Sequence, residues 1–321
     1  MKQVLFFAIL VLFIACQSNN DRKKANRTRQ SSQSPVIVNQ VADADTFSIG
    51  DSNGNIVRSE ANRINAGKSP NTINICSWNL LDFGKTKSDT EIEFIANTVK
   101  NYDIVLIQEV VAKDPGGAQA IGRLGDALNR KGAKWEYRIS NWTSGENSYK
   151  RERYAFLWKQ AKVTLSGKPW LELKYNAEIN REPFYATFRI ADNEFTLLNF
   201  HAITKDSMPE TEVKYFKYLP EEYPELNLIF CGDFNLPQNH TVFNPLKKMG
   251  YQPALTGQKT SLKQACDDEC LSSEFDNFFF NATKITKVSS GVIHFYKSFP
   301  NIKEARKISD HIPIVFEFKL N

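Results

Sequence analysis

The sequence contains little histidine, few cysteines and no apolar run that could cross a bilayer. Only four of its 321 residues are histidine, so chemistry that needs an imidazole must draw on a small set. The apolar run of residues 4–15 has 12 residues, whereas a membrane-spanning helix needs about 20. No internal repeat is visible in residues 71–321, which argues against a repeat architecture.

The chain also carries little net charge outside its N-terminal segment. Its formal net charge is +5, and residues 1–29 account for all of it, with six basic side chains against Asp21 alone. Residues 30–321 are therefore neutral overall. This excludes a broadly basic nucleic-acid surface, so any nucleic-acid binding must rest on a local patch.

The first 16 residues are typical of a bacterial export signal. Lys2 precedes the apolar run, which ends at Ala15-Cys16 and resembles a lipobox, where the cysteine becomes lipidated. We therefore expect an exported protein, anchored by a lipid at Cys16 to the periplasmic or cell-surface side of a bacterial membrane. An ordinary signal peptide with an incidental cysteine is the alternative.

Four cysteines follow Cys16, and export would allow them to oxidise. Cys266 and Cys270 close a very small polar loop, and we predict a disulfide between them. Cys76 and Cys231 lie in apolar, strand-like runs, where a buried free thiol is the common state. A cation site in the acidic loop between Cys266 and Cys270 is an alternative interpretation.

Composition divides the chain into four segments. After the signal at 1–16, residues 17–35 are polar and basic and predict a disordered tether. Residues 36–70 are expected to form a linker or a small β segment, with a hairpin around Asn53-Gly54. Residues 71–321 alternate strand and helix patterns early and are mostly strands later, which predicts an α/β layered domain. We see no signal for an oligomer and expect a monomer.

Helices can be placed within this domain from their periodicity. Ser88 and Glu91 form a capping-box pattern, and apolar residues then recur at helical spacing from Ile92 to Val99. A second helical pattern covers residues 121–128, and a third helix fits Pro209 to Leu219.

Polar residues with catalytic potential fall at the ends of the apolar strand runs. Such residues meet along one edge of a sheet, as the groups of active sites do. They are Trp78-Asn79, Gln108-Glu109, His201, Asp233 with Asn235, and Asp310-His311.

These residue types suit metal-assisted acid–base chemistry. Glu109 is the strongest candidate for a metal ligand, with Asn79 and Asp310 as neighbours, because hard cations prefer oxygen ligands. We expect Mg²⁺ or Mn²⁺, with Ca²⁺ as a further candidate. His201 and His311 suit an acid and a base working together near neutral pH.

Other residues can support that pair. Each imidazole needs an orienting carboxylate, for which Asp276 and Glu152 are the candidates. Asp233 and Asn235, two apart on an extended segment, point to the same side and can bind metal or phosphate. Arg181 can bind a phosphate with two parallel hydrogen bonds.

Residues from about 72 to 321 resemble the endonuclease/exonuclease/phosphatase superfamily, and within it the deoxyribonuclease I-like nucleases. The motifs that carry the resemblance are Gly145–Tyr154, Arg181-Glu182-Pro183 and Ser309-Asp310-His311-Ile312-Pro313. The resemblance implies a four-layer α/β-sandwich, in which two packed mixed β-sheets lie between helices.

The resemblance also implies a role for each site residue. It implies that His311 is the general base, oriented by Asp276, and that His201 is the general acid, paired with Glu152. The implied metal and phosphate environment comprises Glu109 as the main Mg²⁺ ligand, with Asn79, Asp233, Asn235 and Asp310, while Arg181 touches the phosphate and Tyr149 stacks on a sugar or base.

Two departures from this family bear on the substrate. Val111 and Glu146 stand where the family places arginines that enter the DNA minor groove, which should weaken duplex binding. We expect an exported, metal-dependent phosphodiesterase, with DNA endonuclease activity as the favoured function. The alternatives are a phosphoesterase of phosphoinositide or sphingomyelin-type headgroups, and a non-catalytic binding module. The complete catalytic set argues against the last of these.

Overall fold

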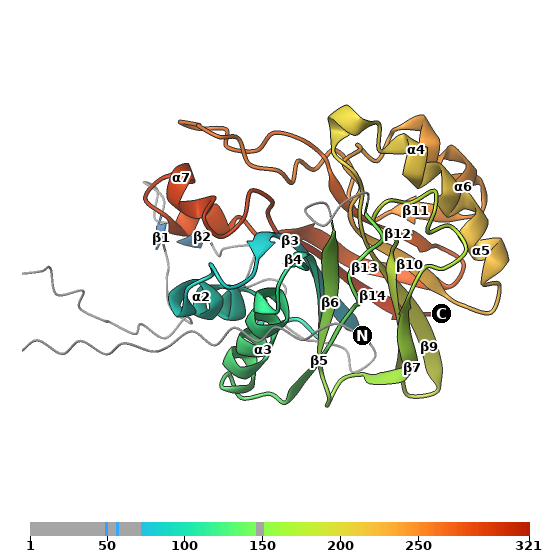
Figure 1. Cartoon of the computed structure of the whole chain (residues 1–321), viewed down its shortest axis with the longest axis horizontal. Helices are drawn as coiled ribbons and strands as arrows, with labels where there is room; N and C mark the ends of the chain where they lie inside the picture. Colours follow the sequence, from blue (N-terminus) through green and yellow to red (C-terminus); the bar gives the residue numbers. More distant parts are fainter. Residues whose placement is uncertain (1–48, 51–55, 58–71, 146–150) are drawn as a thin grey trace, which may run out of the picture. The chain divides into compact units, whose positions relative to one another are not determined.

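The computed structural model describes residues 49–50, 56–57, 72–145 and 151–321 (Figure 1). The chain splits into two compact units, residues 1–66 and 67–321. In the first unit, β1 (Ile49–Gly50) pairs antiparallel with β2 (Ile56–Val57), at the position where the sequence predicts a small hairpin. The predicted signal at 1–16 and tether at 17–35 lie outside the described residues. None of the helices described is long and apolar enough to cross a bilayer.

The second unit contains two six-stranded mixed sheets, whose strand orders are β13-β14-β3-β4-β6-β5 and β11-β12-β10-β9-β8-β7. β3 and β4 pair in parallel in the first sheet, as β9 and β10 do in the second, and the other neighbours are antiparallel. The first sheet comprises β3 (Ile73–Phe83), β4 (Ile104–Val111), β5 (Trp135–Ile139), β6 (Glu152–Lys159), β13 (Ile285–Val292) and β14 (Ile314–Leu320). The second comprises β7 (Thr164–Leu171), β8 (Phe184–Ile190), β9 (Asn193–His201), β10 (Leu228–Asp233), β11 (Tyr251–Pro253) and β12 (Asp276–Asn281).

Helices flank both sheets, which gives the predicted four-layer α/β-sandwich. The first sheet is flanked by α2 (Asp89–Val99), α3 (Gly116–Asn129), η4 (Phe295–Ser298) and α7 (Ile302–Ala305). The second is flanked by η1 (Lys205–Ser207), α4 (Glu210–Val213), η2 (Lys214–Tyr218), α5 (Leu219–Glu222), η3 (Thr241–Phe243) and α6 (Asn244–Lys248).

The alternation of side chains along the strands assigns residues to three apolar layers. In β3, Ile73 and Ile75 pack between the two sheets, whereas Cys76 and Trp78 face the helices of the first sheet. In β10, Ile229 packs between the sheets and Phe230 packs against the helices of the second. Because successive residues of a strand point to opposite faces, each central strand contributes to two layers. This explains the continuous apolar runs in the sequence.

The outcome for the predicted helices and cysteines is mixed. Ser88 forms the predicted capping box with Glu91, and the apolar residues that follow are buried. The single helix predicted for 209–219 is wrong, because that region consists of α4, η2 and α5. Pro220 has no N–H to continue an α-helix.

The predicted bond between Cys266 and Cys270 is confirmed, and Cys76 and Cys231 are free and buried as expected.

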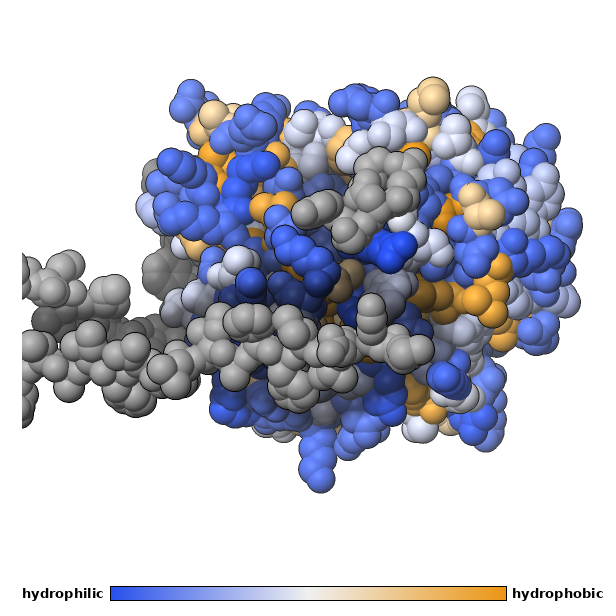
Figure 2. All heavy atoms as spheres, viewed as in Figure 1, coloured by the Kyte–Doolittle hydropathy of each residue, from blue (hydrophilic) through white to orange (hydrophobic). Residues whose placement is uncertain are grey.

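The visible face of the molecule is mostly hydrophilic, with scattered apolar side chains (Figure 2). The large apolar side chains exposed in the described part of the chain come from separate elements: Tyr137, Trp142, Leu173, Met208, Tyr218 and Val288.

Candidate active site

The register of the second sheet aligns three predicted site residues in one row. Asp233 at the end of β10 pairs with His201 at the end of β9 and with Asp276 at the start of β12. In the first sheet, Asn79 of β3 pairs with Gln108 of β4, which places Glu109 next to Asn79. In the second sheet the predicted residues therefore meet at strand ends, whereas Asn79 and Glu109 lie within β3 and β4, where the register between these two strands shifts.

A glycine makes the row in the second sheet possible. Gly232 has φ +128°, and a Cβ atom there would lie 2.0 Å from the carbonyl oxygen of Phe200. Another residue would both strain the backbone and collide with β9. Gly232 thus allows β10 to approach β9 closely and sets Asp233 beside His201.

His201 is held by a carboxylate on one side and faces two others on the opposite side. Its Nδ1 atom lies 3.0 and 3.1 Å from the two carboxylate oxygens of Glu152. Its Nε2 atom lies 3.5 Å from Oδ2 of Asp233 and 4.0 Å from Oε1 of Glu109. Nε2 therefore points into the group of carboxylates.

The charges around His201 favour its protonated form. Burial and the guanidinium of Arg181 lower the pKa of His201, but the carboxylates of Glu152 and Asp233 raise it more, so the pKa lies above its usual value. Burial raises the pKa of Glu152, but His201 and Arg181 lower it below its usual range. Nε of Arg181 lies 3.4 Å from Oε1 of Glu152. The ring is thus suited to donating a proton.

His311 forms the second imidazole–carboxylate pair. Its Nδ1 atom lies 2.7 Å from Oδ2 of Asp276 and 3.6 Å from Oδ2 of Asp233. Burial lowers the pKa of His311, but Asp276 and Asp233 raise it well above its usual value. The hydroxyl of Thr260 donates to Oδ2 of Asp276 at 2.6 Å and fixes that carboxylate.

Hydrogen bonds to the first sheet hold the segment that carries His311. The Ser309 hydroxyl donates to the Asn79 carbonyl at 2.5 Å and accepts the backbone N–H of His311 at 2.9 Å. The indole of Trp78 donates to the His311 carbonyl at 2.8 Å. The buried ammonium of Lys87 donates to the carbonyls of Lys307 and Ile308, at 2.7 and 2.9 Å.

Lys87 and Thr260 are site residues that sequence reasoning missed. Neither lies at the end of an apolar strand run, so the pattern that indicated the other residues gave no signal for them. Ser309 was named only as part of the motif that carries the family resemblance, and no role was predicted for it.

Glu109 occupies an irregular point in β4. Its φ is +59°, and the pairing of β4 with β6 shifts register between Ile107 and Val110. Such a bulge redirects one side chain at a cost in backbone strain. Oε2 of Glu109 accepts the backbone N–H of Asp82, and Oε1 accepts from Nδ2 of Asn79, both at 3.1 Å.

The donor atoms around Glu109 fit a hard divalent cation. Burial raises the pKa of Glu109, and the nearby carboxylates of Glu152 and Asp310 add to this while His201 opposes it. The buried Oδ1 atom of Asn79 has no hydrogen-bond partner. An unpaired amide oxygen beside a carboxylate whose charge is poorly compensated suits Mg²⁺ or Mn²⁺.

The remaining predicted residues are Asp310, Asn235 and Tyr149. Asp310 forms an ion pair with Arg306 at 3.4 Å. Asn235, with φ +51°, donates its backbone N–H to Asp233 at 2.9 Å and its amide to the Ala202 carbonyl at 3.1 Å. Tyr149 lies outside the described residues.

A second group of possible ligands is Asp233, Asp276 and His311, whose donor atoms lie within 4.8 Å of one another. Nδ1 of His311 is already bonded to Asp276 there. We therefore interpret this group as an imidazole with its orienting carboxylates rather than as a metal site.

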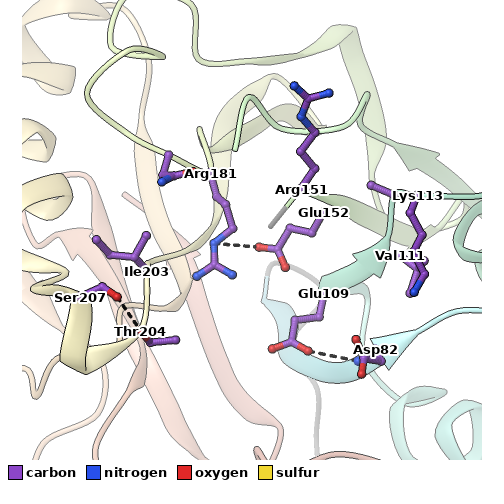
Figure 3. Close-up of a pocket in the computed structure, with 12 residues that line it drawn as sticks. Asp82, Glu109, Val111, Lys113, Arg151, Glu152, Arg181, Ile203, Thr204 and Ser207 are labelled. Atoms are coloured by element: carbon purple, nitrogen blue, oxygen red, sulfur yellow. Dashed lines mark hydrogen bonds and ion pairs between the residues drawn. The ribbon is translucent and has the colours of Figure 1, made fainter. Parts of the chain in front are cut away.

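A cavity of about 330 Å³ opens beside Glu109 and Glu152 (Figure 3). Figure 3 shows Arg181 on one side and Lys113 on the other, with Arg151 between them. Its lining comprises Asp82, Glu109, Val111, Ala112, Lys113, Arg151, Glu152, Asn180, Arg181, Ile203, Thr204 and Ser207.

A profile of a known family covers most of the chain. The profile of the Endonuclease/Exonuclease/phosphatase family matches residues 76–311. This chain belongs to that family. The match takes in every predicted site residue.

Two similar proteins carry the name deoxyribonuclease. A deoxyribonuclease of Thioalkalivibrio sp. (strain K90mix) is 28% identical over 269 residues, which cover 78% of this chain and 72% of that protein. Deoxyribonuclease-1 of Bos taurus is 32% identical over 175 residues, which cover 51% of this chain. The match spans 61% of the bovine protein, less than two thirds of its length. Family and relatives together support a hydrolase that acts on phosphodiester bonds.

Solved structures share the fold at low sequence identity. An endonuclease/exonuclease/phosphatase family protein of Bacteroides thetaiotaomicron has a TM-score of 0.58 and 16% identity, covering 78% of this chain and 98% of that one. A mannosyl-6-phosphatase of the same species has a TM-score of 0.55 and 17% identity, covering 78% and 99%. The fold alone therefore does not fix the substrate.

Proposed function

We propose that this protein is a metal-dependent phosphodiesterase that cleaves DNA internally, with His311 as general base and His201 as general acid. One observation carries the proposal. Each imidazole is bonded through Nδ1 to its own buried carboxylate, and Asp233 lies within 3.6 Å of both rings. Two oriented imidazoles around one buried carboxylate suit the removal of a proton from the attacking water and the donation of another to the leaving oxygen of a phosphodiester.

In the proposed reaction, Nε2 of His311 takes a proton from a water molecule, whose oxygen attacks phosphorus. The bond between phosphorus and the leaving oxygen breaks, and Nε2 of His201 donates a proton to that oxygen. Asp276 and Glu152 stabilise the imidazolium form of their partners and fix the tautomer. The protons then exchange with solvent, which restores both rings.

The remaining residues bind and orient the phosphate. A divalent cation held by Glu109 and Asn79 would neutralise charge on the phosphate oxygens. Asn235 and Arg181 converge on the Ala202 carbonyl, to which both donate. This shared acceptor holds the two side chains near each other, and Arg181 lines the cavity, where its guanidinium can donate to a phosphate oxygen.

DNA is the proposed substrate because the named relatives are deoxyribonucleases. Val111 lines the cavity at the position where the resembling nucleases carry an arginine, so duplex binding must depend on other cations. Lipid or sugar phosphoesters are the alternative substrate class. Insertion into a membrane would be favoured by clustered apolar side chains, whereas the large apolar side chains exposed in the described part of the chain come from separate elements.

We also propose that the protein is exported and anchored by a lipid at Cys16, acting as a monomer. The support for export and the anchor is the sequence of residues 1–16, and the monomer is proposed because the sequence carries no visible signal for an oligomer. If Cys16 carries the anchor, Cys16→Ser should move the protein from the membrane fraction to the soluble fraction. An unchanged distribution between the two fractions would contradict the anchor.

The activity is tested with supercoiled plasmid, Mg²⁺ and the full-length protein in mild detergent. Nicking should disappear with EDTA, and His201→Ala should reduce its rate by about 10²-fold or more. His294→Ala is the matched control, because His294 is exposed and outside the site. A folded protein that does not nick DNA would move the proposal to lipid or sugar phosphoesters.

A further inference from the structure

The cavity beside the catalytic residues contains two cations that the proposed chemistry does not use. Lys113 and Arg151 both line it and are exposed. In the described residues, neither forms an ion pair. Asp114, the carboxylate adjacent to Lys113 in the chain, is paired instead with Lys85 at 3.5 Å.

The third cation of the cavity is already compensated. Arg181 is half-buried, lies 3.4 Å from Glu152 and donates to the Ala202 carbonyl. Its position beside Glu152 suits the phosphate at which the reaction occurs. Lys113 and Arg151 lie away from that pair, across the cavity and at its rim (Figure 3).

The register of the first sheet brings the backbones of Lys113 and Arg151 to the same edge of that sheet. Val111, the last residue of β4, pairs with Glu152, the first residue of β6. Because the strands are antiparallel, Lys113 leaves the sheet at the same edge at which Arg151 enters it. Nε of Arg151 donates to the Gly145 carbonyl at 3.4 Å, and among the residues that the structure describes its terminal nitrogens meet no hydrogen-bond acceptor.

We propose that Lys113 and Arg151 each bind a backbone phosphate of the strand on either side of the cleaved bond, next to the one being cleaved. The substrate is then a polynucleotide strand rather than an isolated phosphoester, which has no second phosphate on its chain. The apolar side chains of Val111, Ala112 and Ile203 provide a surface for the intervening sugar. Phosphate contacts of this kind position the strand without reading its sequence. This inference rests on the proposed phosphodiesterase function.

The test compares two substrates with the full-length protein. The double variant Lys113→Ala/Arg151→Ala is assayed on an oligonucleotide and on bis(4-nitrophenyl) phosphate, which has a single phosphate. The ratio of kcat/KM for the oligonucleotide to that for the small ester should fall on the order of tenfold, through KM. The slope of log(kcat/KM) for DNA against log[salt] should become shallower by roughly one for each phosphate group that the variant no longer binds.

Lys162→Ala/Lys168→Ala is the matched control, because both lysines are exposed and neither lines the cavity. This pair should leave the ratio and the salt slope unchanged. An equal effect of both double variants, or no effect of the first, would overturn the subsite while leaving nuclease activity intact. A parent protein that cleaves the small ester and a phosphoinositide but not DNA would overturn both the proposed function and the subsite.

Discussion

The Nδ1 atom of His311 lies 2.7 Å from Oδ2 of Asp276, and this hydrogen bond joins the two sheets. Asp276 begins β12 of the second sheet, whereas His311 precedes β14 of the first. The proposed base and its orienting carboxylate therefore meet only when the sheets pack together. Catalytic geometry and the packing between the sheets depend on each other.

Removing the charge of Asp276 should change the pH dependence of the reaction. The carboxylate raises the pKa of His311, and a general base must be neutral, so activity is lost as the pH falls through that pKa. Asp276→Asn lowers the pKa of His311 and should move the acidic limb of kcat/KM to lower pH, with a lower maximum. An acidic limb that stays in place in the folded variant would separate Asp276 from the base.

The strand ends of the site could be predicted from sequence because each central strand is a continuous apolar run that ends in a polar residue. The row formed by His201, Asp233 and Asp276 follows from the register of three strands. The apolar runs indicate that such strands exist, but they do not specify which pair. The family resemblance indicated which site residues lie together, whereas the periodicity of apolar residues did not.

The supporting contacts could not be predicted because they join residues far apart in the chain. Thr260 bonds to Asp276, 16 residues away in the chain, and Lys87 reaches carbonyls more than two hundred residues away. The positive φ of Glu109 likewise arises from a bulge, to which the apolar run of β4 gives no clue. Packing between elements decides these features.

Glu109→Gln should separate metal binding from folding. Without metal, the variant should be as stable as the parent, because burial and neighbouring carboxylates already disfavour the charge of Glu109. A cation that binds only the folded state raises the melting temperature, and this rise with Mg²⁺ should be lost in the variant. The rate should fall by about 10²-fold or more.

The matched control for that experiment is Glu194→Gln. Glu194 is exposed on β9 and pairs with Arg189, away from the site. This control should keep the rise in melting temperature. If Glu109→Gln also keeps the whole rise, the metal binds elsewhere, for example among Asp233, Asp276 and His311.

The four cysteines after Cys16 should give a different labelling pattern under each of three conditions. In the native, unreduced protein none should react, because Cys76 and Cys231 are buried, burial raises their pKa, and Cys266 is bonded to Cys270. Denaturation alone should expose Cys76 and Cys231, and denaturation with reductant should expose all four. Peptide mass spectrometry checks each step. Labelling of Cys266 before reduction would rule out the bond in solution.

Lys87→Met should lower both stability and turnover. Methionine keeps an apolar side chain of similar length but leaves the carbonyls of Lys307 and Ile308 without their donor. An unpaired buried group costs about 1–3 kcal/mol, which urea unfolding would measure. The segment that carries Ser309 and His311 would lose an anchor, so kcat should fall more than KM changes. Lys131→Met removes an ion pair between the turn that follows α3 and Glu93 of α2, and it should leave kcat intact. Equal kcat values for the two variants would show that Lys87 contributes to stability alone.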